Sequence, residues 1–345
     1  MEIKRKAFGR TASGTEAFLY SITNHRGMSA VVTDYGAILV SLLVPCPDGR
    51  IRDVVAGYDT IGEYEKGGFF GATVGRHANR ISGASFTLDG MEYHLSDNDN
   101  GCNLHSDFRI GCHKQLWNAE ILTDGVRFSR LSPDGEAGFP GNLEISVTYR
   151  LGEDNALQIS YEGCSDRRTL INLTNHSFFN LAGHNNDSIL DETLTLWSDA
   201  FLEITDGRLP TGRILSVDGT PMDFRNGKRI GSDIDSDWDQ LRYARGYDHC
   251  FVTGAKPGKL KKTALVSDPF SGLTMEAWTD LPGIQVYTAN YLPAQTGKDG
   301  AAYGPRCALC LETEYFPDSI HHPAFPQVVF GPGEVYRGET VYRFL

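Results

Sequence analysis

The sequence predicts an all-β protein, either a sandwich or a barrel. Three observations favour this fold class. Short runs that alternate apolar and polar residues recur along the chain, turn signals separate many of them, and 38 glycines and 15 prolines are spread through 345 residues. Helical periodicity is limited to short stretches near residues 60–64 and 226–234. Because no linker or low-complexity tract interrupts the pattern, we expect one continuous domain over residues 1–345.

The expected strands of the first half of the chain form hairpins in series. Residues 86–95 alternate on both sides of Asp89-Gly90, and an Asp-Gly pair between alternating runs is the strongest short-range signal of a hairpin. The other expected pairs are 30–33 with 38–44, 117–122 with 126–131, and 143–151 with 156–161. Similar runs continue in the second half. The strands expected there are 194–204, 250–253, 263–266, 273–278, 285–288 and 341–345.

Charge and hydrophobicity exclude several classes of partner. The net charge is -12, the pI is near 5.3, and no block of Lys and Arg is long enough to follow a phosphate backbone. We therefore expect neither nucleic acid nor an anionic membrane as a partner. The charged residues 1–6 lead into no apolar segment, and no run of 18 apolar residues occurs. These features favour a cytoplasmic protein with a neutral small-molecule ligand.

The seven cysteines are an odd and scattered set, at positions 46, 102, 112, 164, 250, 307 and 310. This pattern argues against a disulfide framework and favours reduced thiols. Cys307 and Cys310 form a lone Cys-x-x-Cys inside a strand-like run. Because no second such pair and no helix start lies nearby, we interpret them as core thiols rather than as a redox or zinc site.

Two stretches concentrate residues that can carry chemistry. Residues 171–183 begin as an alternating, half-buried strand and then crowd Asn, His and Ser around a pair of phenylalanines. Residues 307–314 form an otherwise apolar strand that places Glu312 and Glu314 on one face. If His176 and Glu312 meet across a pocket, the protein has a matched acid and base.

These two stretches resemble the aldose 1-epimerase (galactose mutarotase) family. That family carries an Asn-x-Thr-Asn-His-Ser-aromatic-Phe-Asn-Leu run, which residues 172–181 match, and a late Leu-Glu-Thr run, which residues 311–313 match. The resemblance covers roughly residues 30–345. It implies the large antiparallel β-sandwich of that family, the galactose mutarotase-like supersandwich, folded as a single domain.

Four further motifs resemble segments of the same family. They are Gly75-Arg76-His77-Ala78-Asn79-Arg80-Ile81, Asn103-Leu104-His105, Gly246-Tyr247-Asp248-His249 and Pro282-Gly283-Ile284-Gln285-Val286-Tyr287-Thr288. Taken alone, most such motifs have a plainer interpretation as surface arginines, a structural histidine or a turn aspartate. The resemblance implies instead that five of their side chains hold sugar hydroxyls. These five are Asn79, Arg80, His105, Asp248 and Gln285.

The chain departs from the family pattern in three places. Ser106-Asp107 follows His105 where the family usually has Gly-Gly, Glu314 stands where Gln is common, and His321 stands where Asn is common. The first departure bears on backbone shape, because Gly often marks a conformation that other residues avoid. The second places another acid two residues from Glu312, and this acid would raise the pKa of Glu312 if both are buried.

The resemblance implies an isomerase that interconverts the α and β anomers of a free aldohexose, galactose or glucose. Glu312 would take the proton of the C1 hydroxyl, and His176 would protonate the ring oxygen as the ring opens. This reaction needs no metal and no other cofactor, and the protein would act as a monomer or a homodimer. Two alternatives belong to other classes: a glycoside hydrolase that uses Glu312 and Asp248, and a non-catalytic sugar-binding protein.

Overall fold

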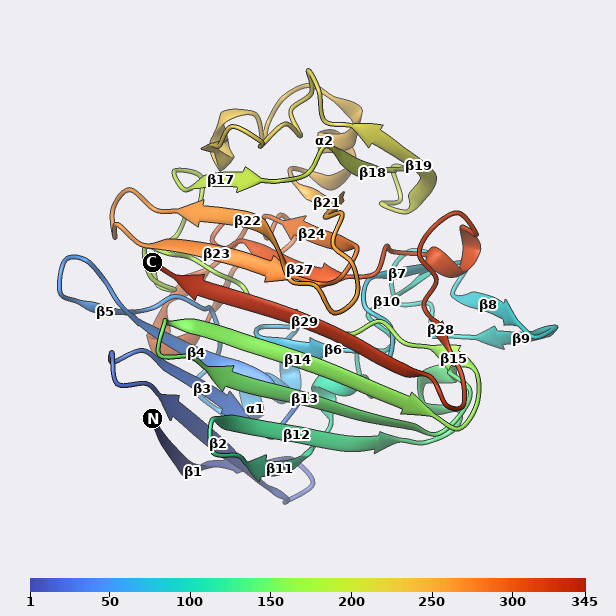
Figure 1. Ribbon diagram of the computed structural model, residues 1–345, viewed down its shortest axis with the longest axis horizontal. Helices are drawn as coiled ribbons and strands as arrows, with labels where there is room; N and C mark the ends of the chain where they lie inside the picture. The colour runs from blue at the N-terminus through green and yellow to red at the C-terminus, as the bar shows by residue number, and fades with distance from the viewer.

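Antiparallel sheets are the main regular structure of the protein (Figure 1), and the computed structural model describes residues 1–345. The largest sheet has nine strands in the order β11-β12-β13-β14-β29-β23-β22-β17-β20. Their bounds are β11 Asn118–Ile121, β12 Gly125–Ser132, β13 Leu143–Leu151, β14 Ala156–Ser165, β29 Val335–Phe344, β23 Thr274–Thr279, β22 Lys261–Ser267, β17 Thr193–Leu196 and β20 Lys228–Arg229.

Two further sheets have five strands each, in the orders β1-β2-β3-β4-β5 and β19-β18-β21-β24-β27. The first consists of β1 Glu2–Arg10, β2 Glu16–Thr23, β3 Ser29–Thr33, β4 Ile38–Pro45 and β5 Ile51–Asp53. The second consists of β19 Pro210–Ser216, β18 Ala200–Ile204, β21 Asp248–Val252, β24 Gly283–Tyr287 and β27 Cys310–Glu314.

Five two-stranded pairs and a few short helices complete the fold. The pairs are β6 Ala72–Val74 with β16 Thr174–His176, β7 Arg80–Ser82 with β10 Cys102–Leu104, β8 Ser85–Leu88 with β9 Met91–His94, β15 Thr169–Leu170 with β28 Val329–Phe330, and β25 Gln295–Thr296 with β26 Ala302–Tyr303. The α-helices are α1 Ile61–Lys66 and α2 Asp239–Ala244. The 3-10 helices are Cys112–Lys114, Glu136–Gly138, Ile230–Ser232, Lys298–Gly300 and Ser319–His321.

The nine-stranded sheet packs against both five-stranded sheets through a shared apolar core. Tyr20 of β2 meets Phe128 of β12 edge to face, with ring centroids 5.7 Å apart. The buried hydroxyl of Tyr342 on β29 donates to the carbonyl of Leu311 on β27 at 2.7 Å. Each sheet thus buries one face against another sheet, and none closes into a barrel, which confirms the predicted antiparallel sandwich.

The predicted hairpins form, but one predicted strand divides. The segment 194–204 becomes β17 and β18, which belong to different sheets. The hydroxyl of Ser198 lies between them, 2.7 Å from the carbonyl oxygens of both Ala200 and Val252, and donates its single hydrogen to one of the two. Because a side chain can replace the backbone ladder in this way, the chain leaves one sheet and enters the next within a few residues.

The helix expected near residues 60–64 is confirmed as α1, and Thr60 and Glu63 form a capping box at its start. The stretch 226–234 instead contains β20 and one 3-10 turn, while the longer α2 begins five residues later. The sequence analysis also missed β1, whose charged residues are mostly exposed at the edge of its sheet. None of the helices combines the length and apolar character needed to cross a membrane. The single domain stays a prediction.

Replacing Tyr149 by Phe is expected to lower the free energy of unfolding by about 1 to 3 kcal/mol, because buried polar groups lose their partner. The Tyr149 hydroxyl donates to the Ala37 carbonyl at 2.7 Å and lies 3.1 Å from Asn175 Nδ2. Urea unfolding measures the loss. In the control Tyr93→Phe, the hydroxyl only contacts the exposed Arg167 at 3.4 Å, and the expected change is below about 0.5 kcal/mol. Equal losses in both variants would contradict the role of the buried hydroxyl.

Candidate active site

A cavity of about 920 Å³ is lined by all seven side chains that the sequence analysis selected. They are Asn79, Arg80, His105, His176, Asp248, Gln285 and Glu312. Its volume lies within the range of small-molecule sites, about 300 to 1,000 Å³. The structure therefore brings together residues from widely separated parts of the chain, although their roles stay predictions.

Three of these residues lie on neighbouring strands of one five-stranded sheet. Glu312 of β27 lies directly opposite Gln285 of β24, and Gln285 lies opposite Cys250 of β21. Asp248 is two residues before Cys250 and so shares its face of β21. The Gln285 amide Nε2 donates to Asp248 Oδ1 at 2.6 Å. Strand register thus aligns a carboxyl, an amide and a second carboxyl along one wall of the cavity.

His176 reaches the cavity from β16, which pairs with β6. Its ring lies nearly parallel to those of Phe178 and Phe69, at centroid distances of 4.8 and 5.7 Å. These rings remove water from the imidazole on its flat sides. Burial therefore lowers the pKa of His176 to about 3.

Asn79 and His105 hold each other through their backbones. The His105 backbone N–H donates to the Asn79 carbonyl, and the Asn79 N–H donates to His105 Nδ1, both at 3.1 Å. Both residues have positive φ, 62° and 56°. Because Nδ1 accepts a hydrogen bond, the ring proton of neutral His105 lies on Nε2. His105 therefore presents a donor to its surroundings.

Ser106 fulfils the backbone role for which the family uses Gly. Its φ is 67°, in the left-handed region that favours glycine. The Ser106 hydroxyl accepts from the His77 backbone N–H at 2.8 Å and donates to the His77 carbonyl at 3.1 Å. These two bonds hold Ser106 in this left-handed conformation.

Glu312 and His176 are the closest acid and base in the cavity. Their Oε2 and Nε2 atoms are 3.6 Å apart, and only 3% and 5% of these residues are exposed. Burial raises the pKa of Glu312 well above its usual value, and the neighbouring carboxylates of Glu314 and Asp248 raise it further. Burial alone favours the neutral forms, whereas the short separation favours the charged pair. At this separation, the protonation of one group depends on the charge of the other.

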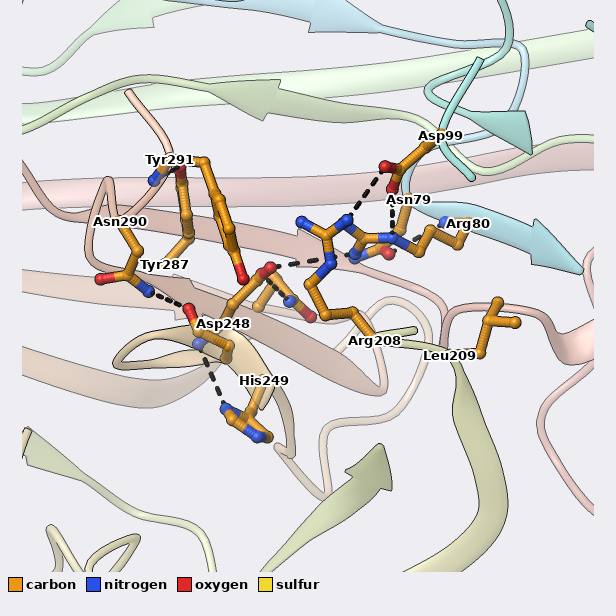
Figure 2. Close-up of polar contacts among 12 residues, drawn as sticks. Asn79, Arg80, Asp99, Arg208, Leu209, Asp248, His249, Tyr287, Asn290 and Tyr291 are labelled. Carbon is orange, nitrogen blue, oxygen red and sulfur yellow. Dashed lines mark hydrogen bonds and ion pairs between the residues drawn. The ribbon is translucent and has the colours of Figure 1, made fainter. Parts of the chain in front are cut away.

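A network of ion pairs lines the cavity next to Tyr291 (Figure 2). Arg80 Nε donates to Asp99 Oδ2 at 2.8 Å, and Arg80 Nη1 lies 3.9 Å from Asp248 Oδ2. Arg208 Nη2 donates to the other oxygen of Asp99 at 3.0 Å, and its guanidinium lies over the Tyr291 ring at 4.6 Å. Two guanidiniums and two carboxylates thus alternate, and their donors and acceptors are held in place.

Sequence reasoning missed Asp99 and Arg208. Both lie in irregular segments, and Arg208 has a φ of 62° between β18 and β19. No alternation marks either position, since side-chain direction in a loop follows from its turns rather than from a fixed period. Phe69 was missed for the same reason.

Other conspicuous residues do not reach the cavity. The Arg76 guanidinium is buried against Ser132 and the carbonyls of Pro133 and Pro140. His321 bonds to Asp318 at 2.6 Å, and this contact raises the pKa of His321. The cysteines of the Cys-x-x-Cys pair are buried free thiols, as the sequence analysis expected. These groups stabilise the fold around the site.

Three cavity residues offer donor atoms within 4.8 Å of one another, namely His105, His176 and Glu312. A metal ion would require a deprotonated nitrogen from each imidazole. Nδ1 of His105 already accepts the backbone N–H of Asn79, and its other nitrogen carries the ring proton. This donor set fits proton transfer better than a resident metal.

Known proteins resemble this chain over nearly its whole length. Residues 19–343 match the profile of a family described as aldose 1-epimerase. The chain is 38% identical to galactose mutarotase of Rattus norvegicus, over 100% of this chain and 99% of the relative. It is 36% identical to aldose 1-epimerase of Escherichia coli, over 95% of each protein. A solved galactose 1-epimerase from Lactobacillus acidophilus superposes with a TM-score of 0.86 at 26% identity, covering 100% of this chain and 98% of that one.

The variant Glu312→Gln is expected to be more stable than the wild type above pH 4.5. The folded state raises the pKa of Glu312, so it binds a proton that the unfolded chain releases as the pH rises past about 4.5. The free-energy cost of keeping Glu312 protonated in the folded state is absent below this pH and grows as the pH rises above it. Removing the carboxyl should add about 1 to 3 kcal/mol at pH 7.

Urea unfolding at pH 4 and pH 7 measures this difference. The control Glu144→Gln removes a carboxyl from an exposed position of β13 and should change stability little at either pH. A Glu312→Gln variant less stable than wild type at pH 7 would contradict the burial argument.

Proposed function

Because the chain belongs to the aldose 1-epimerase family and is an isomerase, we propose that it interconverts the α and β anomers of free galactose or glucose. The observation that carries this proposal is the 3.6 Å separation of Glu312 and His176 inside the cavity. Opening a pyranose ring needs one proton removed and one supplied, and a carboxyl and an imidazole at this separation can do both.

The reaction proceeds through two proton transfers with no net change. Glu312 takes the proton of the C1 hydroxyl, the bond between C1 and the ring oxygen breaks, and His176 gives its proton to the ring oxygen. The open aldehyde then rotates about the C1–C2 bond. In the reverse steps, the oxygen attacks the other face of the carbonyl, returns a proton to His176, and the new C1 oxygen takes one from Glu312.

The remaining predicted residues hold the sugar during the rotation. Asn79, Arg80 and His105 offer N–H donors, whereas Asp248 accepts from hydroxyls. Gln285 already donates to Asp248 and so keeps that carboxylate oriented. A sugar bound by such fixed groups loses little further freedom at the transition state.

The rival functions require different use of the same residues. A glycoside hydrolase would need Glu312 and Asp248 as an acid and a nucleophile or base, yet Asp248 is committed to Gln285 and lies next to Arg80. A non-catalytic sugar-binding protein gains nothing from a buried acid beside an imidazole.

Replacing Glu312 by Gln should lower kcat about 10²- to 10⁴-fold, because the base is lost while the shape of the site stays. KM should change only a few-fold. Polarimetry on freshly dissolved α-galactose and α-glucose measures both constants, with Glu144→Gln as the matched surface control. A near wild-type rate would remove Glu312 from the mechanism, and release of reducing sugar from an aryl glycoside would favour the hydrolase.

The pH dependence of kcat/KM should be bell-shaped. In the active form, Glu312 is deprotonated and His176 is protonated, so activity falls when Glu312 gains a proton at low pH and when His176 loses its proton at high pH. Both limbs of the profile report the coupled titration of Glu312 and His176. In His176→Asn, the bell shape should disappear together with most of the activity. Polarimetry between pH 4 and pH 10 tests this, and a flat profile would contradict it.

A further inference from the structure

Glu314 is the second carboxyl of β27, and the reaction described above gives it no role. It is fully buried and lies on the same face as Glu312. Side chains two residues apart on a strand stand roughly 7 Å apart. Its Oε2 atom is buried without a hydrogen-bond partner. A buried carboxyl with an unpaired oxygen destabilises a fold, so its presence here requires an explanation.

The other oxygen of Glu314 links it to the cavity. Glu314 Oε1 accepts a hydrogen bond from Asn79 Nδ2 at 2.9 Å, and Asn79 Oδ1 accepts from the Arg80 backbone N–H at 2.9 Å. These bonds fix which end of the Asn79 amide is the nitrogen. The second hydrogen on Nδ2 is left for a ligand in the cavity, which Asn79 lines beside Arg80 (Figure 2).

The surroundings of Glu314 and Glu312 supply little positive charge. Arg80 is the nearest cation, and it is already engaged by Asp99 at 2.8 Å and by Asp248 at 3.9 Å. Burial raises the pKa of Glu314 to about 8, even though the Asn79 hydrogen bond opposes this. The other titratable groups that face the two carboxyls are His176, His105, Asp248, Cys250, Tyr287, Cys310, Tyr336 and Tyr342.

We propose that Glu314 is a positioning residue for the proposed epimerase reaction. Its carboxyl orients the Asn79 amide. It also competes with Glu312 for ionisation, because a negative charge on one of the two carboxyls makes a negative charge on the other less favourable. When the charge lies on Glu314, Glu312 keeps its proton and cannot act as a base. Glu314 therefore raises the pH at which the enzyme becomes active. The Gln that is common at this position would keep the acceptor for Asn79 and remove the competition.

The test compares Glu314→Gln with the wild-type enzyme by polarimetry between pH 4 and pH 10. The acidic limb of kcat/KM should move to lower pH by about one to two units, from Coulomb repulsion across roughly 7 Å at an effective dielectric constant near 20. KM should stay within about twofold. In Glu314→Met, the acceptor is lost as well, so KM should also rise several-fold. A merely structural role would not move the limb.

Glu192→Gln is the matched control. Glu192 is also buried, burial raises its pKa to about 8, and one of its oxygens accepts the Leu181 backbone N–H at 2.7 Å. It does not line the cavity, so its replacement should leave the limb in place. A Glu314→Gln profile that superposes on that of the wild type, or an equal shift in Glu192→Gln, would overturn the inference.

Infrared spectroscopy separates this inference from the proposed function. The band of protonated Glu312, identified by its absence in Glu312→Gln, should titrate at lower pH in Glu314→Gln than in the wild type. This measurement needs no activity. A wild-type protein that leaves the anomers unchanged would refute the proposed function alone, whereas equal titration of the band in both proteins would refute the competition between the carboxyls.

Discussion

The burial of one carboxyl beside one imidazole is the constraint on which the site depends. Glu312 and His176 are nearly inaccessible to solvent, and each would lose its charge if it were alone. At 3.6 Å, each is the other's nearest source of compensation. In the proposed reaction, Glu312 can therefore take one proton and His176 can give another without a large change in solvation.

The sheets maintain this arrangement through register. Glu312 faces the cavity because β27 pairs with β24 so that Gln285 lies opposite it. A slip of one residue would turn Glu312 into the apolar core and bring Leu311 or Thr313 to the cavity. The Tyr342 hydroxyl resists such a slip, since it donates to the Leu311 carbonyl from the neighbouring layer. Packing between the two sheets thus determines that Glu312 points into the cavity.

The parts of the site that lie on regular strands or in the motifs of the family could be predicted from the sequence, and the loop residues outside those motifs could not. Glu312 and Gln285 follow the two-residue period of a strand, so their faces were readable before the structure was known. Asp99 and Arg208 have no such period, and what brings them together is a single shared carboxylate. The division of segment 194–204 was equally hidden, because a serine hydroxyl rather than hydrophobicity ends β17.

The charge balance of the ion-pair network around Arg80 and Arg208 fits the proposed neutral ligand. Arg80 and Arg208 are matched by Asp99 and Asp248, so this network offers fixed donors and acceptors with little net field. An anionic ligand would have to compete with these carboxylates for the same guanidiniums. A hydroxyl needs only one donor or one acceptor, and it can bind without breaking an ion pair. The same balance leaves Glu312 and His176 as the groups whose protons are free to move.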